Sequence, residues 1–172
     1  MKNRSLVSIS DYTLDEQLYI LKLAAEFEKN PRQKILENHV VASLFFEPST
    51  RTRLSFESAA SQLSAKIVGF SEAGSSSVSK GESLKDTILT VSNYSDIIVM
   101  RHPREGSAKY ADEVAPIPII NATSTTGPGQ YRRSSVHGGG VSGCRTWTSC
   151  RVINQTMTKY AIASRPATPN ST

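Results

Sequence analysis

The chain has 172 residues, a formal net charge of +5, and 38% hydrophobic and 7% aromatic residues, which allows one well-formed domain and a tail. All 15 Asp and Glu lie within residues 1–113, whereas residues 114–172 contain Lys and Arg but no acid. These late basic residues are scattered, so we expect no nucleic-acid binding. Without a signal-peptide core or a run of membrane-spanning length, we expect a soluble, cytoplasmic chain that does not bind membranes.

The first predicted helix begins at the capping box Thr13-Leu14-Asp15-Glu16 and runs to about Lys29, before Asn30-Pro31. Its apolar side is expected to contain Leu14, Leu18, Leu21 and Ala25. An apolar run over 40–46 then predicts a buried strand that ends at Glu47-Pro48.

Ser49 is a good N-cap for a second helix over 49–64. Its expected apolar residues are Leu54, Phe56, Ala59, Ala60 and Leu63. Further along, the pattern predicts strands over 66–70, 96–100 and 116–121, helices over 82–94 and 104–113, and a Ser/Gly-rich loop over 72–80. Strands that alternate with helices indicate an α/β fold, a parallel sheet with helices on both faces.

The start of the second helix combines several groups that attract anions. Its first turn offers unpaired N–H groups and the positive end of the helix dipole. Hydroxyls and guanidiniums are added there by Ser49, Thr50, Arg51, Thr52 and Arg53. The residue types predict a phosphate site, and an ordinary capped helix with two solvated arginines is the alternative.

The same residues carry a family resemblance. Ser-Thr-Arg-Thr-Arg over 49–53, with Phe-Glu-Pro before it and Leu-Ser-Phe-Glu after it, resembles the carbamoyl-phosphate motif of the aspartate/ornithine carbamoyltransferase family. The resemblance covers roughly residues 4–122 and implies a carbamoyl-phosphate-binding domain over 1–122. It implies carbamoyl-phosphate contacts from Ser49 to Arg53, with Arg51 and Thr52 as catalytic residues, and calls for no cofactor and no metal.

Two further segments resemble the family. Lys80-Gly81-Glu82, in the loop after Phe70, is similar to the aspartate-specific branch, where a loop serine and lysine reach into a neighbouring subunit's site. By position Ser76 and Lys80 would take these shared roles, with Lys80 catalytic and aspartate-binding. Met-Arg-His-Pro over 100–103 implies that Arg101 is catalytic and contacts the carbamoyl phosphate, while His102 supports the loop.

The resemblance fails after residue 122. The family continues to a His-Pro-Thr-Gln motif, but Tyr131-Arg132-Arg133-Ser134 stands at this place. Codons CCG ACG CAG for Pro-Thr-Gln become CGA CGC AG after loss of one C, which encodes Arg-Arg-Ser. We therefore expect residues 123–172 to be a low-complexity, out-of-frame tail in place of an aspartate-binding domain, and a genuine disordered tail is the alternative.

The resemblance thus implies carbamoyl transfer from carbamoyl phosphate to L-aspartate, an early step of pyrimidine synthesis. It also implies a homotrimer that regulatory subunits could join. The chain as written, lacking the second half, is expected to be inactive. The alternatives are an ornithine-type carbamoyltransferase and a non-catalytic family remnant that binds phosphate compounds or full-length subunits.

Overall fold

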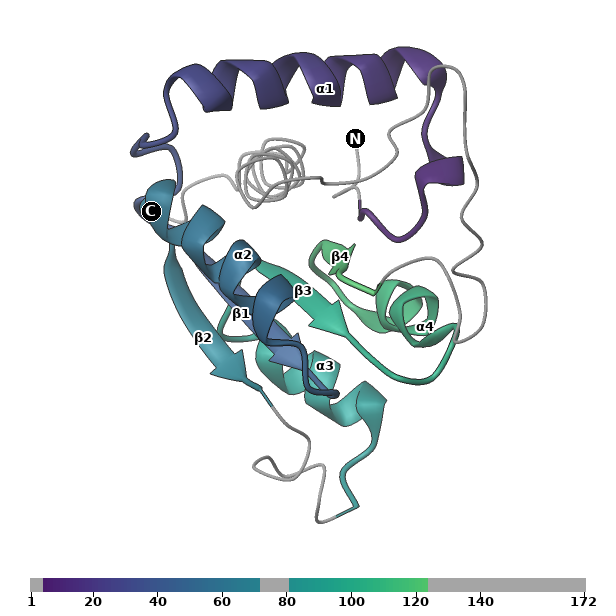
Figure 1. Cartoon of the computed structure of the whole chain (residues 1–172). Coiled ribbons are helices and arrows are strands. Elements are labelled where there is room, and N and C mark those ends of the chain that lie inside the picture. Colours follow the sequence, from purple (N-terminus) through teal and green to yellow (C-terminus); the bar gives the residue numbers. More distant parts are fainter. Residues whose placement is uncertain (1–4, 72–80, 124–172) are drawn as a thin grey trace, which may run out of the picture.

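Val, Ile and Leu-rich runs form a parallel sheet at the centre of the molecule (Figure 1). The computed structural model describes residues 5–71 and 81–123. The sheet has the order β2-β1-β3-β4, and every adjacent pair is parallel. Its strands are β1 (Val40–Phe45), β2 (Lys66–Phe70), β3 (Ile97–Arg101) and β4 (Ile119–Asn121). This parallel sheet confirms the predicted fold class. The bounds of the first three strands agree with the predicted bounds to within a residue or two.

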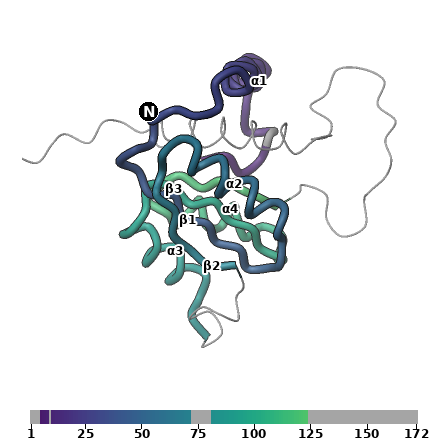
Figure 2. The backbone as a smooth tube through the Cα atoms, turned by 60° about the vertical axis from the view of Figure 1, so that its left-hand side comes forward, coloured from purple at the N-terminus to yellow at the C-terminus, as the bar shows by residue number. Residues whose placement is uncertain are grey.

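The helices cover the two faces of this sheet, with α1 on one side of the strands and α3 on the other in Figure 2. They are α1 (Leu14–Lys29), α2 (Thr50–Gln62), α3 (Leu84–Ser92) and α4 (Ser107–Val114), with a short 3₁₀ helix, η1 (Ile9–Asp11), before them. Alternate strand residues point to opposite faces. Val41, Phe45 and Val99 therefore pack in a core with α1 and α2, and Leu44 and Met100 pack with α3 and α4.

Helix α1 begins where the capping box predicts. Thr13 N–H donates to Glu16 Oε2 at 2.9 Å, and the Thr13 hydroxyl accepts from Glu16 N–H. The predicted buried side is wrong, because Leu14 is 70% exposed and Leu18 is 53% exposed. The residues that face the core are instead Ile20, Leu23, Ala24 and Phe27. The helix carries two apolar stripes, and periodicity alone could not decide between them.

Helix α2 also differs from expectation in two details. Ser49 occupies the N-cap position, but its side chain makes no capping hydrogen bond. Leu54 is 48% exposed, whereas Phe56, Ala59, Ala60 and Leu63 are buried as predicted. The helix ends in a Schellman motif, with Ala65 N–H bonded to Ala60 O and Ser64 N–H to Ser61 O, both at 3.0 Å.

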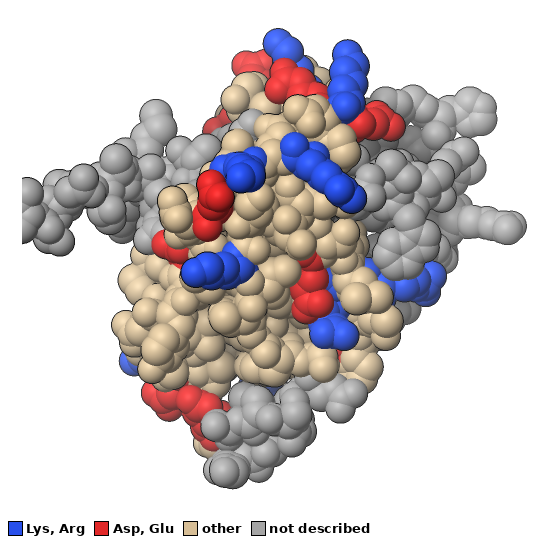
Figure 3. Space-filling view, turned by 90° about the vertical axis from the view of Figure 1, so that its left-hand side faces the viewer, with Lys and Arg blue, Asp and Glu red and all other residues tan. Residues whose placement is uncertain are grey.

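Strand β2 lies at one edge of the sheet and approaches β1 closely. A Cβ on Gly69 would lie 2.1 Å from the carbonyl oxygen of Ser43. Residues Ile67 and Val68, on opposite faces of β2, are both exposed. Figure 3 shows the side on which β2 lies in Figure 1, and residues other than Lys, Arg, Asp and Glu make up much of the middle of that surface.

The other edge of the sheet is covered by the chain before η1, which the sequence pattern did not predict. Leu6 N–H donates to Ile119 O at 2.7 Å, and Asn121 N–H donates to Leu6 O at 2.9 Å. These bonds form a parallel bridge between Leu6 and Ile120. The segment fixes β4, whose end contributes to the candidate site.

Candidate active site

Three strands of the sheet end side by side at its carboxyl edge. Phe46 N–H, just after β1, donates to Arg101 O at 2.9 Å. Ala122 N–H, just after β4, donates to Met100 O at 2.8 Å. In open α/β sheets ligands bind beyond this edge. The structure therefore brings the segment that leads into α2 next to Arg101 and to the start of the chain after β4.

The start of α2 carries the predicted phosphate-binding residues. The first helical hydrogen bond runs from Arg53 N–H to Ser49 O at 3.0 Å, so the N–H groups of the preceding residues have no acceptor within the helix. Arg51 is exposed. Within residues 5–71 and 81–123, no carboxylate pairs with Arg51, which leaves its charge available to an anion.

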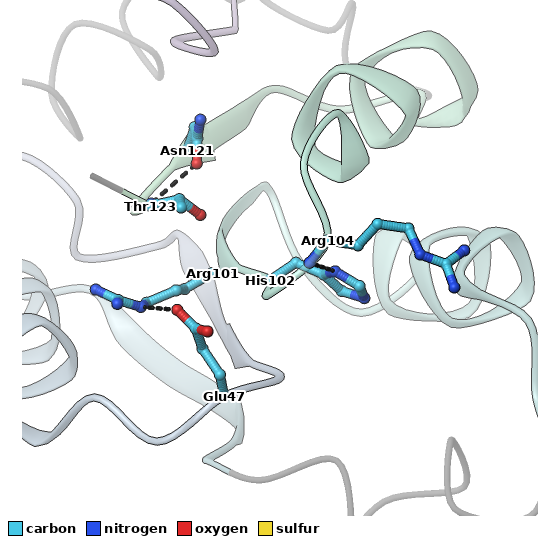
Figure 4. Close-up of polar contacts among 6 residues, drawn as sticks. All are labelled: Glu47, Arg101, His102, Arg104, Asn121 and Thr123. Atoms are coloured by element: carbon cyan, nitrogen blue, oxygen red, sulfur yellow. Dashed lines mark hydrogen bonds and ion pairs between the residues drawn. The ribbon is translucent and has the colours of Figure 1, made fainter. Parts of the chain in front are cut away.

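Arg101 is held by a carboxylate of the same edge. Its Nε lies 2.5 Å from Glu47 Oε1, and both side chains are about three-quarters buried. Figure 4 shows the two side chains meeting below Asn121, the last residue of β4, and Thr123, two residues further along. Glu47 is only two residues before Ser49, so this ion pair ties Arg101 to the entry of α2.

Arg53 has a different environment from Arg51. Its Nη1 lies 3.5 Å from Glu57 Oε1, one turn along the same helix. The same carboxylate oxygen accepts a hydrogen bond from Ser43 Oγ of β1 at 3.1 Å. Arg53 therefore belongs to a polar contact between α2 and the sheet, and its role in anion binding stays a prediction.

His102 follows Arg101 and points to the other side of the strand end in Figure 4. Its Nδ1 lies 3.0 Å from Arg104 N and 2.9 Å from Ser107 Oγ. Burial is the largest effect on the pKa of His102 and lowers it below its ordinary value of 6.5.

The remaining sequence-predicted residues, Ser76 and Lys80, lie outside the described residues, as do Tyr131 and residues 124–172 of the tail. Sequence reasoning gave no role to Glu47. Its place directly after a buried strand and before Pro48 was the available signal, because such a carboxylate must lie at the carboxyl edge.

The part of the chain that the structure describes contains no candidate metal site and no candidate membrane span. No group of three or more His, Cys, Asp and Glu side chains there could hold a metal ion. No helix there combines the length and the apolar character needed to cross a bilayer.

The arrangement defines a class of protein: parallel α/β domains with a cationic helix start beyond the strand ends, the place at which such sheets bind their ligands. The model of the aspartate/ornithine carbamoyltransferase carbamoyl-P binding domain matches residues 4–131. The chain belongs to this family.

Individual relatives agree with this assignment. The aspartate carbamoyltransferase catalytic subunits of Bacteroides fragilis and Phocaeicola vulgatus are each 62% identical to the chain over 122 residues. These residues are 71% of this chain but only 40% and 39% of those relatives.

Solved structures give the same result. The catalytic subunit of M. jannaschii aspartate transcarbamoylase is 48% identical, with a TM-score of 0.64 over 69% of this chain and 41% of that one. A Trypanosoma cruzi aspartate transcarbamoylase in complex with carbamoyl phosphate and aspartate is 36% identical, with a TM-score of 0.66 over 70% and 39%.

Proposed function

We propose that the chain is the carbamoyl-phosphate-binding part of an aspartate carbamoyltransferase catalytic subunit. The complete enzyme would transfer a carbamoyl group from carbamoyl phosphate to L-aspartate, releasing phosphate. The observation that carries this proposal is the meeting of Arg101 with the segment that begins α2 at the carboxyl edge of the sheet. The named relatives are aspartate enzymes, which favours aspartate over ornithine as the second substrate.

In this proposal the N–H groups and hydroxyls at the start of α2 hold the phosphate, together with Arg51 and Thr52. Arg101 leaves Glu47 to contact the carbamoyl oxygen and the phosphate. As the amine of aspartate attacks the carbonyl carbon, a tetrahedral oxyanion forms, and a cation fixed at this place stabilises it more strongly than it stabilises the substrate. The bond between the carbonyl carbon and the phosphate oxygen then breaks, and phosphate departs with the proton that the attacking nitrogen loses.

The binding step is tested by titration calorimetry of the 172-residue chain with carbamoyl phosphate. Replacing Arg51→Ala removes one charge-assisted contact and should cost roughly 1.5–3 kcal/mol of binding free energy. Arg32→Ala is the matched control, because Arg32 is exposed and precedes β1, near the amino edge of the sheet. Equal binding by the wild type and the Arg51→Ala variant would reject the assignment.

We also propose that the tail after residue 122 stands in place of an aspartate-binding domain, because a base was lost near codon 132 and the residues from there onward are out of frame. The end of the family match at Tyr131, next to Arg132, supports that position. The exposed stripe of Leu14 and Leu18 on α1 is consistent with cover supplied by a missing part. Sequencing the gene from codon 120 onward tests this: a restored frame must encode Pro-Thr-Gln, and an unrelated or stop-rich frame would refute it.

The repaired protein would be a homotrimer whose sites are shared between subunits, with Ser76 and Lys80 serving a neighbour. Holding both substrates together supplies much of the rate enhancement of a two-substrate reaction. Because the aspartate-binding domain is replaced in this proposal, the 172-residue chain should form no carbamoyl aspartate. Lys80→Ala and Arg51→Ala subunits of the repaired protein should each be impaired. Mixing them should recover activity through hybrid sites, and mixtures that stay inactive would contradict shared sites.

A further inference from the structure

The imidazole of His102 accepts two hydrogen bonds at a single nitrogen. The backbone N–H of Arg104 can only donate, so Nδ1 must be an acceptor and the proton of the neutral ring lies on Nε2. The hydroxyl of Ser107, the buried first residue of α4, then donates to the same Nδ1. The ring thus closes the turn that joins β3 to α4.

The same ring contacts the end of the neighbouring strand. The ring centroids of Phe46 and His102 lie 4.9 Å apart, and Phe46 meets Phe70 edge-on at 5.1 Å. Phe46 directly precedes Glu47, and His102 directly follows Arg101. One imidazole therefore contacts both chain segments that carry the Arg101–Glu47 ion pair, although it takes no part in that pair.

We propose that His102 is a positioning residue for Arg101: its neutral imidazole, fixed as the Nε2–H tautomer, holds the strand ends at which Arg101 and Glu47 meet. This role rests on the proposed function in one respect only, namely that Arg101 contacts carbamoyl phosphate from the position that His102 maintains. No bond to His102 forms or breaks in this role.

Protonation would disrupt the arrangement. A charged imidazole carries a proton on Nδ1, which then opposes the N–H of Arg104. The Ser107 hydroxyl can turn and accept a hydrogen bond, but the Arg104 N–H cannot. Of the charged groups that the structure describes around the ring, Arg104 disfavours the charged form and Glu47 favours it.

The test is the NMR signal of the Arg101 Nε–H in the ligand-free 172-residue chain, followed from about pH 8 to about pH 5, where histidine titrates. In the wild type the Nε–H proton should be protected against exchange with water at high pH, so its signal is sharp. The signal should shift and broaden when the imidazole is protonated. His102→Asn keeps an acceptor near the position of Nδ1 and should retain the signal at both pH values. His102→Phe keeps a ring but no acceptor, so the signal should be lost or shifted throughout.

Ser107→Ala removes one donor without touching the ring and should leave the protected signal in place at high pH. A protected, pH-independent signal in both the wild type and the His102→Phe variant would overturn the proposal. Phosphate titrations of the same proteins separate the proposed function from the proposed role of His102. If the wild type binds no phosphate, the proposed function fails, while the ligand-free Arg101 signal still decides the role of His102.

Discussion

Arg101 and Glu47 form an ion pair between the ends of two adjacent strands, with Nε and Oε1 2.5 Å apart. The two residues are 54 positions apart in the sequence, and the parallel pairing of β1 with β3 brings them together. Because Glu47 occupies the Nε edge of the guanidinium, a phosphate that uses that edge for a bidentate contact must compete with Glu47.

This competition predicts that Glu47→Gln binds phosphate more tightly than the wild type. The amide removes a negative charge from the site and releases Arg101, so the affinity for phosphate should rise by about fivefold for each 1 kcal/mol that the ion pair contributes. Calorimetry with inorganic phosphate measures it. Glu37→Gln is the control, since it removes a carboxylate that pairs with Lys34 on an exposed surface. Weaker binding by Glu47→Gln would show instead that the carboxylate helps to present Arg101.

The contact of β2 with β1 predicts a severe effect of Gly69→Ala. The new Cβ would lie 2.1 Å from Ser43 O, and the backbone φ of Gly69 is +138°. Since the obstacle is backbone, relief requires β2 to move, and a loss of roughly 3 kcal/mol or more of unfolding free energy is expected. Urea denaturation measures the loss. Gly106→Ala also has a positive φ but meets nothing within 4 Å, so it should cost only about 1–2 kcal/mol; equal losses would contradict the steric account.

The end of α2 predicts a stabilising substitution. Ser64 adopts φ +66°, a left-handed conformation that disfavours a residue with a Cβ. Ser64→Gly should therefore raise the unfolding free energy by about 0.5–1 kcal/mol, because the strain outweighs the greater entropy of glycine in the unfolded chain. Thermal denaturation measures the change. Ser61→Gly, within the same helix, should lower stability, and a loss in both variants would show that Ser64 is not strained.

The lowered pKa of His102 predicts a particular dependence of stability on pH. The unfolded chain, with a histidine pKa near 6.5, binds this proton more readily than the folded chain. The contribution of the neutral ring is therefore present above about pH 6.5, decreases as the pH falls towards the folded pKa, and is constant below it. The melting temperature should fall between about pH 7.5 and about pH 5.5, and the fall should be larger for the wild type than for His102→Asn. Equal falls would contradict this assignment.

Much of the fold could be predicted because its signals are local. The capping box at Thr13, the stop at Pro48 and the apolar runs of β1 and β3 each set an element boundary without help from distant residues. The side of α1 that is buried could not be predicted in the same way. Leu14 and Ile20 lie on different stripes of one helix, and only the position of the sheet decides which stripe is covered.

The candidate site was predictable to a similar extent. The motif from Ser49 to Arg53 identified the cationic helix start, and Arg101 could be assigned to the same edge because parallel strands end together. The partners of these arginines were not predictable. Arg53 pairs within its own helix with Glu57, whereas Arg101 pairs with Glu47 across the sheet, and both choices depend on side-chain geometry.

The proposed binding site for carbamoyl phosphate lies where α2 begins beside Arg101. The most direct measurement is a titration of the ¹⁵N-labelled 172-residue chain with carbamoyl phosphate, followed by amide and arginine side-chain NMR signals. The account predicts saturable shifts confined to residues 49–53, Glu47 and Arg101 and their immediate neighbours, which Arg51→Ala should weaken by about tenfold or more. Absence of saturable shifts, or shifts centred on the amino ends of the strands near Arg32, would contradict it.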